Sequence, residues 1–312
     1  MLIHLNIQQL GKIKMIGNTA ALAAALCWAL GGLIAVTPVN RLGTTGFNRI
    51  RMPLSFLMLS ALAFFTDGWS SVDLSFIWYI VFSSIIGIFL GDSALFYTIN
   101  KIGPRRTGIL FAANAPMTAI ISFIVFQERL SFPQIAGCSI VLFGVFLAIA
   151  FGTTSNQCHK WEQVKGNLFL GVLTGLFSAF CQALSAIVII PVMESGSDPI
   201  SISALRVGIS SVVVIMYSWI RSNHTHSPKY SKPTIGLVAW IACCGFIGMG
   251  MGMTFLLFGL SKGEAGIITA LAATTPVMML PLLWFKTGER PSLGSWFGAI
   301  LTVVGSGILF NL

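Results

Sequence analysis

A series of long apolar stretches, almost free of charge, limits the folds open to this chain. A helix needs roughly 20 apolar residues to cross the hydrocarbon core of a bilayer. Stretches of that length without strict alternation are typical of membrane helices and not of barrel strands. Charges, prolines and short polar clusters delimit ten of them, near residues 16–36, 50–66, 75–97, 106–127, 132–151, 166–190, 201–220, 235–259, 264–286 and 293–310. We therefore expect an all-α membrane protein with ten transmembrane helices.

The composition excludes a soluble domain. Of the 312 residues, 55% are hydrophobic and 9% are charged, whereas a soluble protein has about 25% charged residues. The net charge is +9, but the 18 lysines and arginines are scattered between the apolar stretches and form no basic run. This distribution is typical of loops that anchor membrane helices. We therefore expect the lipid bilayer as a partner, and no nucleic acid.

The second half of the sequence repeats the first. The segment KIGPRRTGILFAANAP, which ends at Pro116, aligns with SKGEAGIITALAATTP, which ends at Pro276, at an offset of 160 residues. At an offset of 161 residues a Glu-Arg pair and two glycines also recur, as Glu128-Arg129 with Glu289-Arg290, Gly137 with Gly298, and Gly144 with Gly305. Repetition at a fixed offset indicates that one structural unit occurs twice.

Each half contains five of the expected helices. We predict a first five-helix repeat over residues 16–151, a polar linker over 152–165 and a second repeat over 166–310. Because five is odd, the second repeat must enter the membrane from the opposite face. Inverted repeats of this kind are the usual basis of alternating access in secondary transporters. A duplication that serves stability alone is the alternative.

The repeated segments resemble a known family. The Ala-rich fourth stretch with its proline (AANAPMTAIISFIVFQERL), the Glu-Arg pair that ends it, the G-x6-G stretch that follows and their copies in the second half are similar to the EamA-type ten-helix carriers of the drug/metabolite transporter superfamily. Residues 91–103 (GDSALFYTINKIG) resemble the third helix of that family. The resemblance covers the whole chain. It implies a secondary transporter of small metabolites or amphipathic compounds in the plasma membrane, with a central cavity between the repeats.

An integral membrane enzyme or a channel is the alternative. The four histidines lie in tails or loops, no HExxH or DxxxD motif occurs, and the six cysteines have no CxxC spacing. We therefore expect no catalytic residue, no cofactor and no metal site. A channel would predict a continuous polar stripe along several helices, which the sequence lacks. The partner that we expect beside the bilayer is a small-molecule substrate, and no signal indicates a particular oligomeric state.

Three charged residues in or near the apolar stretches are candidates for function. Arg51 and Arg206 lie near the start of the second and seventh stretches, and we predict that they present a cation to an anionic substrate group; snorkelling to lipid headgroups is the alternative. Asp92 lies inside the third stretch, where a carboxylate is suited to proton coupling. A hydrogen bond to hydroxyls or an ion pair with one of the arginines is the alternative for Asp92. Gly252 occupies the matching position of the second half.

Polar, aromatic and proline residues inside the stretches complete the candidate site. Aromatic and amide side chains inside a bundle can line a substrate pocket, although Trp and Tyr also populate the membrane interface. Proline removes a backbone donor and bends a helix, so Pro116 and Pro276 are expected to kink the fourth and ninth helices at the cavity wall. The side chains that we predict to line the cavity are Trp28, Tyr97, Asn114, Gln182 and Thr274.

The orientation in the membrane has two interpretations. More of the loop lysines and arginines lie on the side opposite to the termini than on the side of the termini. The positive-inside rule therefore places both termini outside, whereas the resemblance implies that both are inside.

Overall fold

The computed structural model describes residues 7–126, 131–150, 163–224, 233–263 and 265–309, and all regular structure in these residues is helical. The prediction of an all-α membrane protein is confirmed. Within the described residues two shorter apolar helices, at 132–147 and 293–308, accompany six segments that are long and apolar enough to cross a membrane: Lys14–Phe65, Leu74–Ile102, Pro104–Val125, Leu168–Glu194, Pro199–Ile220 and Ile235–Lys262.

In the first half, the first two expected spans are two helices that meet at Gly43 and together carry the label α1 (Ile7–Phe65). Gly43 has φ 70° and ψ 168°, a conformation that glycine adopts without steric cost. The chain therefore turns at Gly43 from the first span into the second. The elements that follow are η1 (Gly68–Ser71), η2 (Leu74–Phe76), α2 (Ile77–Ser83), η3 (Ser84–Asp92), α3 (Ser93–Ile102), α4 (Pro104–Phe111), α5 (Asn114–Phe126) and α6 (Phe132–Ala150).

The second half repeats this order of spans. The Glu128-Arg129 pair and most of the expected linker lie outside the described residues. The elements of the second half are α7 (Leu168–Glu194), α8 (Pro199–His224), α9 (Ile235–Gly245), η4 (Phe246–Gly252), α10 (Met253–Lys262), α11 (Ala265–Ala272), α12 (Thr275–Thr287) and α13 (Leu293–Leu309).

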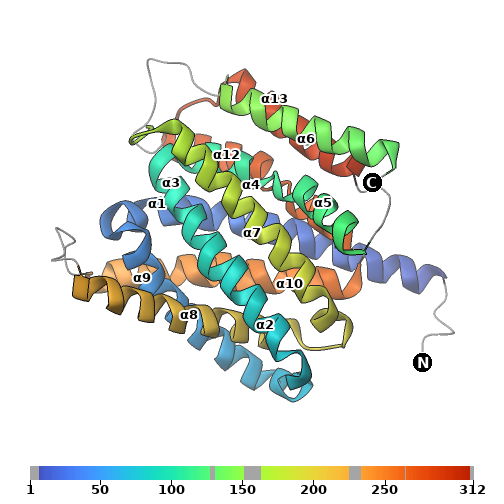
Figure 1. Cartoon of the computed structure of the whole chain (residues 1–312), viewed down its shortest axis with the longest axis vertical. Coiled ribbons are helices and arrows are strands. Elements are labelled where there is room, and N and C mark those ends of the chain that lie inside the picture. Colours follow the sequence, from blue (N-terminus) through green and yellow to red (C-terminus); the bar gives the residue numbers. More distant parts are fainter. Residues whose placement is uncertain (1–6, 127–130, 151–162, 225–232, 264, 310–312) are drawn as a thin grey trace.

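The two halves pack on each other through matching helices. The first span, in α1, contacts η4 and α10 of the second half, and the sixth span, α7, contacts η3 and α3 of the first half. The second part of α1 packs against α8 through a buried cluster that includes Met52, Leu59 and Val207. Figure 1 shows the fifth spans, α6 and α13, side by side along one edge of the bundle. Each half therefore completes the core of the other.

Glycines allow α6 and α13 to approach closely. A Cβ atom on Gly144 would lie 2.8 Å from the carbonyl oxygen of Gly298, and a Cβ atom on Gly305 would lie 2.9 Å from the carbonyl oxygen of Gly137. Both distances are shorter than real Cβ atoms tolerate, so a larger side chain at either position would push the helices apart. The G-x6-G spacing that recurs in the sequence thus forms a reciprocal helix contact.

Four irregular segments occur at matching places in the two halves. The third and eighth spans contain the π-helical segments η3 and η4, which end at Asp92 and Gly252. The fourth and ninth spans are interrupted at residues 112–113 and 273–274. Both interruptions lie just before the prolines, since Pro116 and Pro276 are in the first turns of α5 and α12. The backbone N–H groups of a first turn have no partner within the helix, so a proline there costs no helical hydrogen bond. Helices with π turns or breaks often border functional sites.

Candidate functional site

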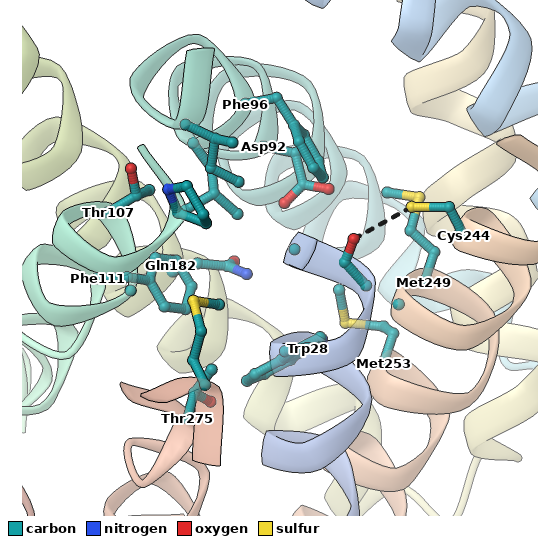
Figure 2. Close-up of a pocket in the computed structure, with 18 of the residues that line it drawn as sticks. Trp28, Asp92, Phe96, Thr107, Phe111, Gln182, Cys244, Met249, Met253 and Thr275 are labelled. Carbon is teal, nitrogen blue, oxygen red and sulfur yellow. Dashed lines mark hydrogen bonds between the residues drawn. The ribbon is translucent and has the colours of Figure 1, made fainter. Parts of the chain in front are cut away.

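Two small cavities lie between the halves, and three side chains line both of them. The first, which we call the Asp92 cavity, has a volume of about 60 Å³, and the second, the Arg206 cavity, about 30 Å³. Trp28 of α1, Gln182 of α7 and Met253 of α10 line both. In Figure 2 the Trp28 and Gln182 side chains point into the Asp92 cavity from two different helices. These three side chains therefore separate the two cavities.

A buried ion pair borders the Asp92 cavity. Nη2 of Arg51 donates a hydrogen bond to Oδ2 of Asp92 at 2.9 Å. The guanidinium carbon of Arg51 also lies 4.3 Å from the ring centroid of Phe96 and 5.2 Å from that of Phe47, so two aromatic rings add cation–π contacts. Only 2% of Arg51 is exposed. Snorkelling to headgroups is therefore the wrong interpretation of Arg51, and of the alternatives for Asp92 the structure shows the ion pair.

Arg206 is equally buried but contacts neutral groups. Its exposed fraction is 2%, which rules out snorkelling for this residue too. Nη2 donates to Oγ of Ser185 at 2.7 Å, Nη1 donates to Sδ of Met253 at 3.2 Å, and Nε has no partner. Within the described residues the ion pair between Arg51 and Asp92 has no equivalent at Arg206. Asp92 is near enough to act on Arg206 electrostatically, but its ion pair is with Arg51. The two arginines and the one carboxylate therefore leave one positive charge in excess.

Serine hydroxyls hold the helix segments around Arg206. The Ser84 hydroxyl donates to the backbone carbonyl of Arg206 and lies 2.8 Å from Oγ of Ser210. Oγ of Ser83 lies 2.9 Å from Oγ of Ser185, the group that accepts the Arg206 hydrogen bond. These contacts join α2 and η3 to α7 and α8. They hold the helix segments that position the guanidinium. These serines belong to no sequence motif, so they could not be identified from the sequence.

Asn114 contributes a polar group to the Arg206 cavity. It is the first residue of α5, directly after the break in the fourth span. Its side chain lines the cavity, and its Oδ1 is buried without a hydrogen-bond partner. The neighbouring Thr118 also lines the cavity and donates to the backbone carbonyl of Asn114 at 2.8 Å. Asn114 and Arg206, which both line this cavity, thus each have one buried polar atom without a partner, Oδ1 and Nε.

Two residues predicted to line the cavity lie elsewhere in the structure. Tyr97 lines neither the Asp92 cavity nor the Arg206 cavity, and the Lys101 ammonium lies 5.4 Å from its ring centroid. Thr274 also lines neither, and its hydroxyl donates to the Leu271 carbonyl at 2.7 Å. Their neighbours Phe96 and Thr275 line the Asp92 cavity instead. One residue along a helix turns the side chain by about 100°, which is the reason for both corrections.

Methionines form a part of the site that sequence reasoning missed. Met249 and Met253 line the Asp92 cavity from the second half, and Figure 2 shows Met249 beside Cys244. Their thioether side chains are flexible and polarisable, so they adapt to ligands of different shape. The alternating Gly-Met run at residues 248–253 was the available signal.

Within the described residues no group of three or more His, Cys, Asp or Glu side chains could hold a metal ion.

Known proteins resemble the chain over most of its length. The EamA-like transporter family matches residues 15–150 and 169–311, one segment in each half. A Bacillus subtilis (strain 168) protein named "Uncharacterized transporter YyaM" is 24% identical over 276 residues, which cover 82% of this chain and 80% of that protein. A solved structure titled "Crystal structure of protein" superposes with a TM-score of 0.64 at 14% identity, over 94% of this chain and 95% of the other, and supports the fold.

These matches agree with the resemblance that the repeated segments carry. They identify an integral multi-pass membrane protein of the transporter kind, and the family match occurs once in each half of the chain. The chain belongs to the EamA-like transporter family.

Proposed function

We propose that this protein is a secondary transporter that moves small metabolites or amphipathic compounds by alternating access. The observation that supports this most strongly is the pair of cavities between the halves, which share Trp28, Gln182 and Met253 as a partition. A carrier needs a central site that opens to one side of the membrane and then to the other. In this proposal Trp28, Gln182 and Met253 bind the substrate while the two halves move around it.

The site must widen during the transport cycle. The Asp92 cavity has a volume of about 60 Å³. Pockets for small organic ligands have volumes of roughly 300–1,000 Å³. Residues of η3 and η4, and residues directly beside the breaks at 112–113 and 273–274, line the cavities. We propose that these irregular segments bend when the cavity opens.

We also propose that Asp92 couples transport to protons. Protonation would neutralise the Asp92 carboxylate and remove its ion pair with Arg51, now at 2.9 Å. The released guanidinium would then be free to move with the second span, and deprotonation would restore the contact. Gly252 matches Asp92 in the second half, so the proton step belongs to the first half alone.

Reconstitution tests both parts of this proposal. Purified protein in proteoliposomes is assayed for uptake of amino acids and other small metabolites, with and without a proton gradient. Transport that depends on the gradient in the wild type and not in Asp92→Asn, compared at equal amounts of folded protein, is the expected result. Asp67→Asn is the matched control, since Asp67 is exposed and outside the predicted membrane spans. Unchanged proton dependence in Asp92→Asn eliminates the coupling role, and a chain that moves no compound eliminates transport.

A further inference from the structure

We infer that the transported molecule is a small organic monoanion, of the carboxylate class, whose anionic group binds Arg206 in the Arg206 cavity. The inference rests on the proposed transport function and names the substrate class of the same site. It follows from the charge in the cavities, from the difference between the two halves and from the polar atoms that are left without partners.

The cavity walls carry one positive charge in excess. The charged residues that line the two cavities are Arg51, Asp92 and Arg206. Asp92 neutralises Arg51 through the 2.9 Å ion pair, whereas Arg206 donates to a hydroxyl and a thioether. A buried charge without a counter-charge is costly, because the interior screens and solvates it poorly. One bound monoanion would balance the charge, whereas a dianion would leave a negative excess.

The second half lacks the carboxylate that the first half provides. Asp92 ends η3 and binds Arg51; the residue that ends η4 is Gly252. A Cβ atom on Gly252 would lie 2.8 Å from Cδ1 of Trp28, so the indole occupies the space of a side chain there. The next residue, Met253, accepts a hydrogen bond from Arg206 through its sulfur, which is a weak acceptor. In the part of the chain that the structure describes, Arg206 therefore has a hydroxyl and a thioether as acceptors and no carboxylate.

The polar atoms around Arg206 suit a carboxylate. Nε of Arg206 is buried without a partner, and a guanidinium binds a carboxylate through two parallel N–H donors. Asn114 has an unpartnered buried amide oxygen beside the same cavity, and its amide can be turned to donate to an anion instead. Apolar side chains, among them Leu256 and Ala272, line other parts of the wall. These apolar side chains can contact the hydrocarbon part of a small carboxylate. They offer no polar contact to an inorganic anion such as phosphate or sulfate.

Ligand-dependent thermal stability of the purified full chain tests the inference. The probes are butyrate and 3-phenylpropionate, each compared with its neutral amide, together with inorganic phosphate and sulfate. The carboxylates are expected to raise the melting temperature of the wild type, and the amides are not. Arg206→Gln should weaken carboxylate binding by about 10- to 100-fold, the effect of losing hydrogen bonds to a charged group.

A further test places a carboxylate beside Arg206 within the protein itself. Met253→Glu places an acid of similar size next to Arg206, and Met253→Gln is its neutral control. Met253→Glu should melt at a higher temperature than Met253→Gln without ligand, and carboxylates should no longer stabilise it. This pair keeps the inference testable even if Arg206→Gln does not fold.

Several results would overturn the inference. These are equal stabilisation of the wild type by carboxylates and amides, no stabilisation by any anion of the panel, or unchanged carboxylate binding in Arg206→Gln. Transport of neutral or cationic compounds alone would also overturn it and leave the proposed transport intact. Binding of carboxylates through Arg206 without transport of any compound would support the inference and remove the proposed function.

Discussion

Replacing Gly144 by alanine tests the closest helix contact of the fold. The added Cβ atom would lie 2.8 Å from the Gly298 carbonyl oxygen and 3.0 Å from Cβ of Leu301, so α6 and α13 must separate by several tenths of an ångström. Forcing an extra carbon into a packed interface costs about 1–3 kcal/mol. Alanine also favours an exposed helix over glycine by about 1 kcal/mol, which offsets part of this cost. We therefore expect Gly144→Ala to lower the free energy of unfolding by up to about 2 kcal/mol.

Equilibrium unfolding in mixed micelles with increasing SDS, followed by circular dichroism, measures this change. The matched control is Gly236→Ala in α9, because a Cβ atom there would have no neighbour within 4 Å. The control should leave stability unchanged or raise it slightly. Gly305→Ala, the reciprocal position, should destabilise the protein as Gly144→Ala does. If Gly144→Ala behaves like Gly236→Ala, the close contact between α6 and α13 does not hold the fifth and tenth spans together, and the packing argument fails.

Two further predictions concern the buried ion pair and the turn between the first two spans. Asp92→Asn should destabilise the protein by about 3–5 kcal/mol, because it leaves the Arg51 charge buried without a partner. The double variant of Asp92→Asn with Arg51→Gln should recover most of this loss. If the losses of the two single variants add in the same unfolding assay, the ion pair does not contribute as argued. Gly43→Ala should destabilise the protein by about 1 kcal/mol or more, since φ 70° at Gly43 strains any other residue; Gly236→Ala is again the control, and equal melting temperatures of the two variants would refute the requirement for glycine.

The candidate site could be predicted from the sequence in part. Arg51, Arg206 and Asp92 were identifiable because a charge inside an apolar stretch has few explanations. Trp28 and Gln182 were identifiable as an aromatic and an amide side chain inside apolar stretches, and both line the two cavities. The serines around Arg206 and the methionines of the second half were missed, because such residues also occur throughout the interiors of membrane helices.

The sequence by itself determined the all-α membrane fold, the extent of most spans and the repetition of the chain. These properties depend on the length of the apolar stretches and on the offset between repeated segments, and both can be read directly from the order of residues in the chain. The glycines at which α6 and α13 meet recur in the sequence as two equally spaced pairs, but their contact with each other came from the structure.

Only the tertiary structure decided which helix faces meet. Asp92 pairs with Arg51 and not with Arg206, and Phe96 and Thr275 line the site where Tyr97 and Thr274 were expected. A shift of one residue turns a side chain by about 100°, and a π-helical turn alters that rotation for every residue after it. Which side of a span faces the cavity therefore depends on how the other half packs against it, and no pattern within one stretch contains that information.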